Sequence, residues 1–70
     1  MTETVKNTIQ ILRTKMGLTQ EELAGRVAVS RQTIIAIERG NYTPSVALAM
    51  KLAKVFTTSV EKIFIIAYEK

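Results

Sequence analysis

Apolar side chains recur at helical spacing along most of the chain, and the pattern predicts five helices. In the first segment Val5, Ile9, Leu12 and Met16 stand three or four positions apart, so they share one face of a helix. Gly17 follows and supplies a C-terminal stop, because glycine readily takes the left-handed conformation in which many helices end.

The second and third helices carry start signals as well as an apolar face. Thr19 and Glu22 form a capping-box pattern, in which each side chain bonds the backbone amide of the other residue. The second helix then continues to about Val27, and Ser30 is a good N-cap for the third. The third helix is expected to end at Gly40.

The connection between these two helices is little more than residues 28 and 29, which forces a sharp angle between them. Ala24 lies where two helices must approach closely. The apolar positions around the corner are Leu23, Val27, Val29, Ile34 and Ile37. This spacing predicts a helix-turn-helix over about residues 20–39.

The remaining sequence predicts two further helices and an ambiguous tail. The fourth helix covers about residues 45–56 and is capped either by Ser45 or by Thr43 with Pro44 at the first helical position. Its candidates for burial are Leu48, Ala49, Leu52, Ala53 and Val55. The fifth helix is short, about residues 59–64. Residues 65–70 favour β structure, so they form either an extended tail or a short strand, which residues 1–5 are placed to pair with.

Length and composition predict one small domain over residues 1–70 with an anionic partner. Ten Lys and Arg against six Asp and Glu give a net charge of +4, which favours nucleic acid. The chain has no Cys and no His, so we expect no disulfide, metal or cofactor. A domain of this size is marginally stable alone, which makes a second copy a reasonable partner.

The sequence also argues against a membrane protein. The longest apolar run, residues 63–68, is far shorter than the roughly 20 residues of a membrane span. Residues 1–10 are mostly polar and do not resemble a signal peptide. We therefore expect a cytoplasmic protein that does not bind membranes. No small-molecule ligand is indicated.

Several blocks of the sequence, in order and at matching spacing, resemble the Cro/C1-type helix-turn-helix family, also called the XRE family. They are residues 18–24 (LTQEELA), 29–34 (VSRQTI), 37–40 (IERG), 42–45 (YTPS), 52–54 (LAK) and 59–64 (SVEKIF). The resemblance implies an all-α, compact five-helix domain of the lambda-repressor type, whose third helix enters the major groove. It implies a transcriptional regulator, with repression the expected role.

Two positions depart from the family pattern. The turn position, usually glycine in the family, is Ala28, and alanine is costly in a left-handed conformation. Conversely, Gly25 lies inside the second helix, at a cost of about 1 kcal/mol relative to alanine. Both suggest modest stability.

The first turn of the third helix points into the groove in this family. Arg31 is suited to guanine O6 and N7, and Gln32 to adenine N6 and N7. Thr33 and Ser30 are candidates for phosphate or base contact, although Ser30 is equally well explained as a helix cap. One turn later, Ile35 and Ala36 either pack on thymine methyl groups or are ordinary exposed residues; these two residues are the remaining members of the predicted reading face.

Other residues are expected at the DNA backbone. By resemblance, Gln20 contacts a phosphate and braces Gln32, helped by the amide groups at the start of the second helix. Arg39 is either solvated or near a phosphate. The loop residues Asn41, Tyr42 and Thr43 resemble a family segment that touches the backbone, although Tyr42 is alternatively a core residue.

The resemblance also predicts an ion pair and a subunit interface. Arg13 and Glu38 match a pair that ties the first helix to the third in many relatives. The C-terminal segment, about residues 59–70, holds more apolar side chains than one small core needs, so we expect a homodimer interface there. The expected interface residues are Val60, Ile63, Phe64, Ile65, Ile66 and Tyr68. Such a dimer places two recognition helices about 34 Å apart on a palindromic operator.

Three other functions compete with DNA regulation. An enzyme is disfavoured, because the chain offers no acid–base or nucleophile constellation. An antitoxin-like or partner-dependent protein-interaction role uses the same fold and stays open. Non-specific binding to RNA or DNA is disfavoured, because only four aromatic residues are present to stack on bases.

Overall fold

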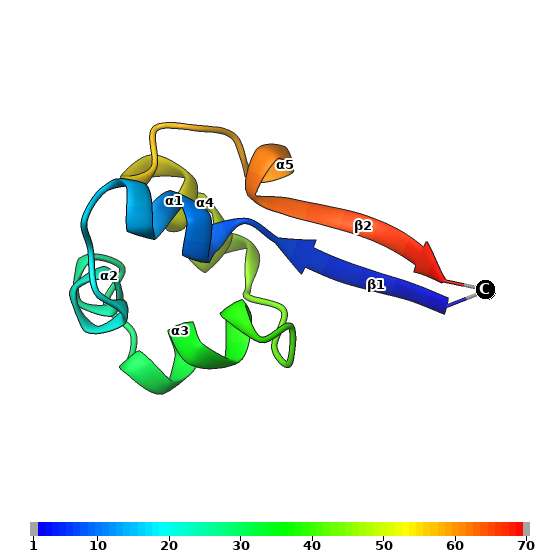
Figure 1. Cartoon of the computed structure of the whole chain (residues 1–70), viewed down its shortest axis with the longest axis horizontal. Coiled ribbons are helices and arrows are strands. Elements are labelled where there is room, and N and C mark those ends of the chain that lie inside the picture. Colours follow the sequence, from blue (N-terminus) through cyan, green and yellow to red (C-terminus); the bar gives the residue numbers. More distant parts are fainter. Residues whose placement is uncertain (1, 70) are drawn as a thin grey trace.

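The computed structural model describes residues 2–69 and shows a helical body from which a two-stranded ribbon projects (Figure 1). The elements in chain order are β1 (Thr2–Asn7), α1 (Ile9–Lys15), α2 (Gln20–Arg26), α3 (Arg31–Glu38), α4 (Val46–Val55), α5 (Val60–Ile63) and β2 (Phe64–Glu69). The five predicted helices are confirmed, and of the two alternatives for the tail the structure has the strand. No helix among these residues has the length and apolar character needed to cross a membrane.

The predicted helix starts are confirmed by side-chain caps. Thr19 and Glu22 form both bonds of the capping box at α2. The Ser30 hydroxyl accepts a hydrogen bond from the Thr33 amide at α3, and Ser45, rather than Thr43, caps α4. Each such cap satisfies a backbone amide that the helix leaves without a partner.

The first four helices end in the same way, on a residue with positive φ. The next amide then donates back to a carbonyl five positions earlier, as Val29 does to Ala24 (3.0 Å) after α2. Two of the positive-φ residues are Gly17 and Gly40, but the other two are Ala28 (φ 59°) and Thr57 (φ 50°). The left-handed conformation predicted at Ala28 is therefore present.

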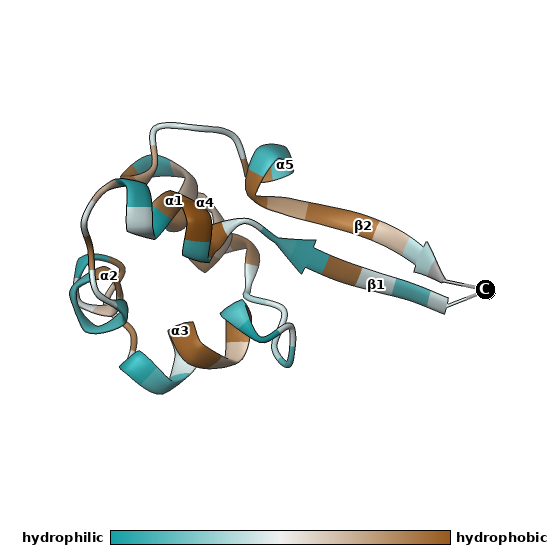
Figure 2. Ribbon diagram, in the orientation of Figure 1, coloured by the Kyte–Doolittle hydropathy of each residue, from teal (hydrophilic) through white to brown (hydrophobic). Residues whose placement is uncertain are grey.

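The core is built from the inward faces of all five helices. Its fully buried large side chains are Ile9, Leu23, Val27, Ile34, Ile37, Leu52 and Ile63. The hydropathy colouring shows apolar stretches on α1, α3 and α4 (Figure 2), and their buried side chains belong to one core cluster. The expected burial in α4 is confirmed for Leu48, Ala49, Leu52 and Ala53.

The ribbon is an antiparallel pair that joins the two ends of the chain. Asn7 pairs with Phe64 and Val5 with Ile66, which confirms the expected pairing of residues 2–5 with the tail. Val5 therefore belongs to a strand, and its predicted place on the first helix is wrong. A two-stranded sheet is marginal in water on its own, so its attachment to the helical body is important.

Asn7 and Thr8 attach the base of the ribbon to three helices. The Asn7 side-chain amide donates to the carbonyl of Ile37 at the end of α3 (2.8 Å) and accepts from the amide of Ile9 (3.2 Å). The Thr8 amide donates to the carbonyl of Ile63 (2.9 Å). One short junction thus positions α1, α3, α5 and the ribbon relative to one another.

Candidate nucleic-acid interface

The corner between α2 and α3 is fixed by packing as well as by its short turn. Leu23 and Ala24 of α2 and Ile34 and Ile37 of α3 are buried in one core cluster. Because Ala28 takes a left-handed conformation, the chain reverses within residues 27–30 and α3 begins at once. The outer face of α3 is therefore presented rigidly, as a helix-turn-helix requires.

The start of α3 presents polar side chains outward. Arg31 and Gln32 are exposed, while Ile35 and Ala36, one turn later, are half-buried. Thr33 is also half-buried, and its hydroxyl lies 3.1 Å from that of Ser30. Ser30 thus acts as the cap of α3, and its hydroxyl is engaged with Thr33 in the unbound protein.

Two hollows flank the outer face of α3. The first, of about 280 Å³, is polar and is lined by Gln10, Gln20, Arg31, Ile35, Glu38 and Arg39. The second, of about 370 Å³, is lined by Gln32, Thr33, Ala36, Asn41 and Tyr42. The structure thus brings most of the predicted DNA-contacting residues to one surface, divided by the ridge of α3.

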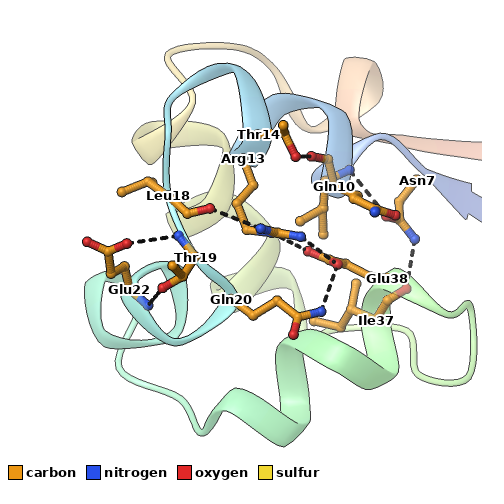
Figure 3. A network of polar contacts seen from close by, with 11 residues as sticks. Asn7, Gln10, Arg13, Thr14, Leu18, Thr19, Gln20, Glu22, Ile37 and Glu38 are labelled. Atoms are coloured by element: carbon orange, nitrogen blue, oxygen red, sulfur yellow. Dashed lines mark hydrogen bonds and ion pairs between the residues drawn. The ribbon is translucent and has the colours of Figure 1, made fainter.

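Gln20 and Glu38, which line the first hollow, form a polar network with Arg13 (Figure 3). Arg13 donates from Nε and Nη2 to the two carboxylate oxygens of Glu38, at 2.8 and 3.3 Å. It also donates to the carbonyl of Leu18 (2.9 Å). The predicted ion pair is therefore present, and its side chains are only 14% and 6% exposed.

The side chain of Gln20 is bonded to this network and not to Gln32. Its side-chain Nε2 donates to Glu38 Oε1 (3.1 Å), and no bond joins it to Gln32 within residues 2–69. The expectation that Gln20 braces Gln32 is therefore wrong in the unbound protein, because the Glu38 carboxylate is the stronger acceptor within its reach. One hydrogen of the Gln20 amide is still free to bind another acceptor.

The start of α2 is less suited to phosphate than expected. The Glu22 amide already donates to the Thr19 hydroxyl (3.0 Å), and Glu21 and Glu22 place negative charge in the first turn. Hydrogen bonds from Thr19, backbone first and then side chain, lower the pKa of Glu22 below its ordinary value of 4.5, and the nearby positive charge of Arg26 adds to the effect. Glu22 is thus held ionised, which opposes an anion at its own helix.

The loop after α3 divides between two surfaces. Tyr42 is 48% exposed and lies in the second hollow with Asn41, so it is not a core residue. Thr43, in contrast, lines an apolar hollow on another part of the surface and does not join the residues around α3. Of the three loop residues, two therefore stand beside the recognition helix.

This apolar hollow has a volume of about 220 Å³ and is a candidate surface for contact with another protein chain. It is lined by Val5, Thr43, Pro44, Val46, Ala49, Val60 and Phe64. On the ribbon, β2 is apolar over most of its length (Figure 2). Ile66 is 57% exposed and pairs with Val5, while Ile65 lies on the opposite face, because side chains alternate along a strand.

One correction to the predicted interface follows from burial. Ile63 is fully buried in the monomer core and cannot contact another subunit. Val46 and Met50, which no pattern singled out, are 77% and 61% exposed on α4. Their spacing of four residues beside the core stripe was the only signal in the sequence that they share a face.

Comparisons with known proteins agree with this geometry. The sequence profile of the helix-turn-helix family matches residues 9–63. An uncharacterized HTH-type transcriptional regulator of Methanocaldococcus jannaschii is 54% identical over 61 residues, which cover 87% of this chain and 92% of that protein. The competence pilus inhibition repressor of Acinetobacter baylyi is 39% identical over 59 residues, covering 84% of this chain and 54% of the longer protein.

A solved structure supports the same assignment. The restriction-modification controller protein C.AhdI of Aeromonas hydrophila superposes with a TM-score of 0.71 at 31% identity, covering 77% of this chain and 82% of that one. Family, relatives and fold all indicate a regulator rather than an enzyme. The chain therefore belongs to the helix-turn-helix family of Cro/C1 (XRE) type and is a DNA-binding transcriptional regulator of lambda-repressor-like fold.

Proposed function

We propose that this regulator is a repressor that binds a palindromic operator in double-stranded DNA as a homodimer, with α3 of each subunit in the major groove. The observation that carries the proposal is the pair of neighbouring exposed side chains, Arg31 and Gln32, on the first turn of a helix whose Ile34 and Ile37 are buried. The helix is anchored by its apolar side and free to read bases with the other.

Each side chain has a chemical role on this surface. Arg31 can donate two hydrogen bonds to guanine O6 and N7, and Gln32 can pair with N6 and N7 of adenine. Arg39 and the free hydrogen of Gln20 lie in the first hollow beside Arg31, where they suit phosphate oxygens. Because Arg13 neutralises Glu38, that carboxylate does not repel the DNA backbone there.

Binding should first be tested by selecting duplexes from a random pool and measuring affinity against salt. A specific operator and a log–log slope of about −0.9 per phosphate contact are expected. Arg31→Ala and Gln32→Ala should each lose about 1–3 kcal/mol and relax preference at one base pair. Lys54→Ala, on the exposed face of α4, is the matched control. Equal loss on every duplex would reassign Arg31 and Gln32 to backbone contacts.

We place the dimer interface on the apolar hollow and the adjoining ribbon face. Val60, Phe64, Ile66 and Tyr68 keep their predicted role, whereas Ile65 faces the other way. The exposed apolar side chains of Val46, in the hollow, and of Ile66, on the adjoining ribbon, make this surface suited to a second subunit.

Paired substitutions on the two ribbon faces test this assignment. Ile66→Asp should give a monomer in sedimentation, while Ile65→Asp, a similarly exposed residue on the opposite face, should leave the dimer intact. In the dimer, the centres of the two half-sites should lie one helical turn, about 10 base pairs, apart. A monomeric wild-type protein would instead favour a partner-dependent or antitoxin-like role for the same surface.

Repression is supported by one relative. The Acinetobacter baylyi protein that matches this chain over 59 residues is named a repressor, and blocking a promoter requires only occupancy of the operator. Expression of a reporter from a promoter that overlaps the selected operator should fall when the protein is produced. Increased expression would identify an activator. This role places the protein in the prokaryotic cytoplasm, with the DNA.

A further inference from the structure

The side chain of Asn7 connects the base of the ribbon to the end of the recognition helix (Figure 3). Its Nδ2 donates to the carbonyl of Ile37 (2.8 Å), and its Oδ1 accepts from the amide of Ile9 at the start of α1 (3.2 Å). Within residues 2–69, the bond to Ile37 is the only hydrogen bond between the ribbon and α3. Asn7 is therefore the one direct polar connection between the ribbon and the helix proposed to read DNA.

The carbonyl of Ile37 is free to accept this bond because α3 ends here. In a continuing helix it would accept from the amide of Asn41, four positions later. That amide instead donates to Ala36 (2.9 Å), and Ile37 accepts from Gly40 (2.9 Å) with one of its two lone pairs. Asn7 occupies the other lone pair, so it completes the hydrogen bonding at the end of the recognition helix.

Backbone bonds hold Asn7 in the ribbon while its side chain is bound to α3. Asn7 pairs with Phe64 in the register of the two strands, and the amide of the next residue, Thr8, donates to the carbonyl of Ile63 (2.9 Å). The peptide that carries the Asn7 side chain therefore cannot turn without the ribbon. The bond to Ile37 thus fixes the direction in which the ribbon leaves the helical body.

The direction of the ribbon matters because the proposed dimer surface lies partly on it. Ile66 and Tyr68 are 57% and 63% exposed on the ribbon, whereas the apolar hollow lies mainly on the helical body. Tyr68 stands four residues beyond Phe64, or about 13 Å along the strand, so a turn of about 10° at the base would move it by about 2 Å. To keep both contacts, the two subunits of a symmetric dimer would each have to shift by a similar amount, together about 4 Å, which exceeds one base step of about 3.4 Å.

We infer that Asn7 is a positioning residue for operator recognition, whose side-chain amide fixes the ribbon relative to α3 and thereby sets the spacing of the half-sites that the dimer reads. Asn7 acts through the ribbon and α3 rather than by touching a base. The inference rests on the proposed homodimer on a palindromic operator and adds to it the contact that sets the distance between the two recognition helices.

The test measures binding to the selected operator and to two further duplexes, in which one base pair is inserted or removed between the half-sites. For the wild type, either change should reduce affinity about tenfold or more, because the two recognition helices can no longer bind at once. Asn7→Asp keeps an acceptor for the Ile9 amide but has no hydrogen to donate to Ile37. It should weaken binding to the operator and reduce the differences among the three duplexes to about twofold.

Two readouts separate this role from a general loss of structure. A duplex with a single half-site needs only one subunit, so its affinity should be the same for Asn7→Asp and for the wild type. Sedimentation should show a dimer for both proteins.

Two further variants serve as controls. Asn7→Ser carries no charge and is too short to reach Ile37, so it should reproduce the reduced spacing preference, and it replaces Asn7→Asp if the added charge unfolds the protein. Thr8→Val is the matched control at the same junction. It removes the hydroxyl bond to the carbonyl of Lys62 (3.2 Å), which does not involve α3, and should keep the wild-type preference.

The outcomes separate this inference from the proposed function. A folded Asn7 variant with the spacing preference of the wild type overturns the inference. So does a loss of single-half-site binding as large as the loss on the operator, because Asn7 would then act on α3 itself, and so does a monomeric variant, because Asn7 would then act on association. In each case the wild-type dimer and its operator would still stand. A wild type that is monomeric on its operator, or that selects none, would overturn the proposed function itself.

Discussion

Exchanging the residues at positions 25 and 28 should stabilise the protein without changing its composition. Gly25 lies inside α2, and a Cβ atom added there meets no heavy atom within 4 Å. Ala28 has φ of 59°, in the region that favours glycine. Gly25→Ala should therefore remove the penalty of glycine in a helix, and Ala28→Gly the penalty of an L-residue in a left-handed conformation.

The magnitude follows from these two penalties. Gly25→Ala should gain about 0.8–1 kcal/mol, the difference in helix propensity. Ala28→Gly should relieve about 1–2 kcal/mol of backbone strain, less the roughly 0.5–1 kcal/mol that glycine loses in chain entropy. The pair should thus gain about 1–2 kcal/mol, or a rise in Tm of about 5–15 °C for a domain of this size.

Thermal unfolding followed by circular dichroism measures the effect. All variants should be compared at one protein concentration, because association makes Tm concentration-dependent. Gly40→Ala is the matched control: it makes the same chemical change as Gly25→Ala, but at φ of 78°, and it should lower Tm. A lower Tm for Ala28→Gly, or shifts of equal sign for Gly25→Ala and Gly40→Ala, would refute the reasoning.

Three further predictions concern the charged residues. Glu38→Ala should cost about 2–3 kcal/mol in urea unfolding, because it leaves Arg13 largely buried without its partner, and adding Arg13→Ala should cost less than the sum of the single changes. Thr19→Ala should raise the pKa of Glu22, measured by NMR, toward its ordinary value. In the wild type, the lowered pKa of Glu22 adds to the free energy of unfolding above the ordinary pKa, and this contribution is lost as the pH falls through the lowered pKa. If Thr19→Ala left the loss of stability in acid unchanged, the role of the capping box would be contradicted. Arg39→Ala should reduce the salt slope of DNA binding by about 0.9 without changing base preference, and an altered preference would make Arg39 a base contact.

The elements with local signals were predictable from the sequence. The caps at Thr19, Ser30 and Ser45 depend on residues three positions apart, and the corner at Ala28 depends on a few neighbours. The Arg13–Glu38 pair was expected only through resemblance to a family, since nothing local relates these two positions.

What the sequence did not predict depends on contacts between distant segments. Val5 continues the apolar spacing of α1, and only its pairing with Ile66, near the other end of the chain, places it in a strand. The hydrogen bond from Gln20 to Glu38 likewise depends on how α2 and α3 pack against each other. Val46 resembles a core residue by type, and it is exposed because of the way in which α4 packs against the other helices.

The register of the ribbon also sets the order in which the molecule can assemble. The contacts of α2 with α3 and of α4 with α5 join near neighbours, whereas β1 and β2 join residues separated by almost the entire chain, and closing so long a loop carries the larger entropic cost. We therefore expect the helical body to form first and the two strands to pair last, starting at Asn7 and Phe64 and continuing toward the ends of the chain. A subunit contact that includes Ile66 would then arise only between molecules whose DNA-reading half is already folded.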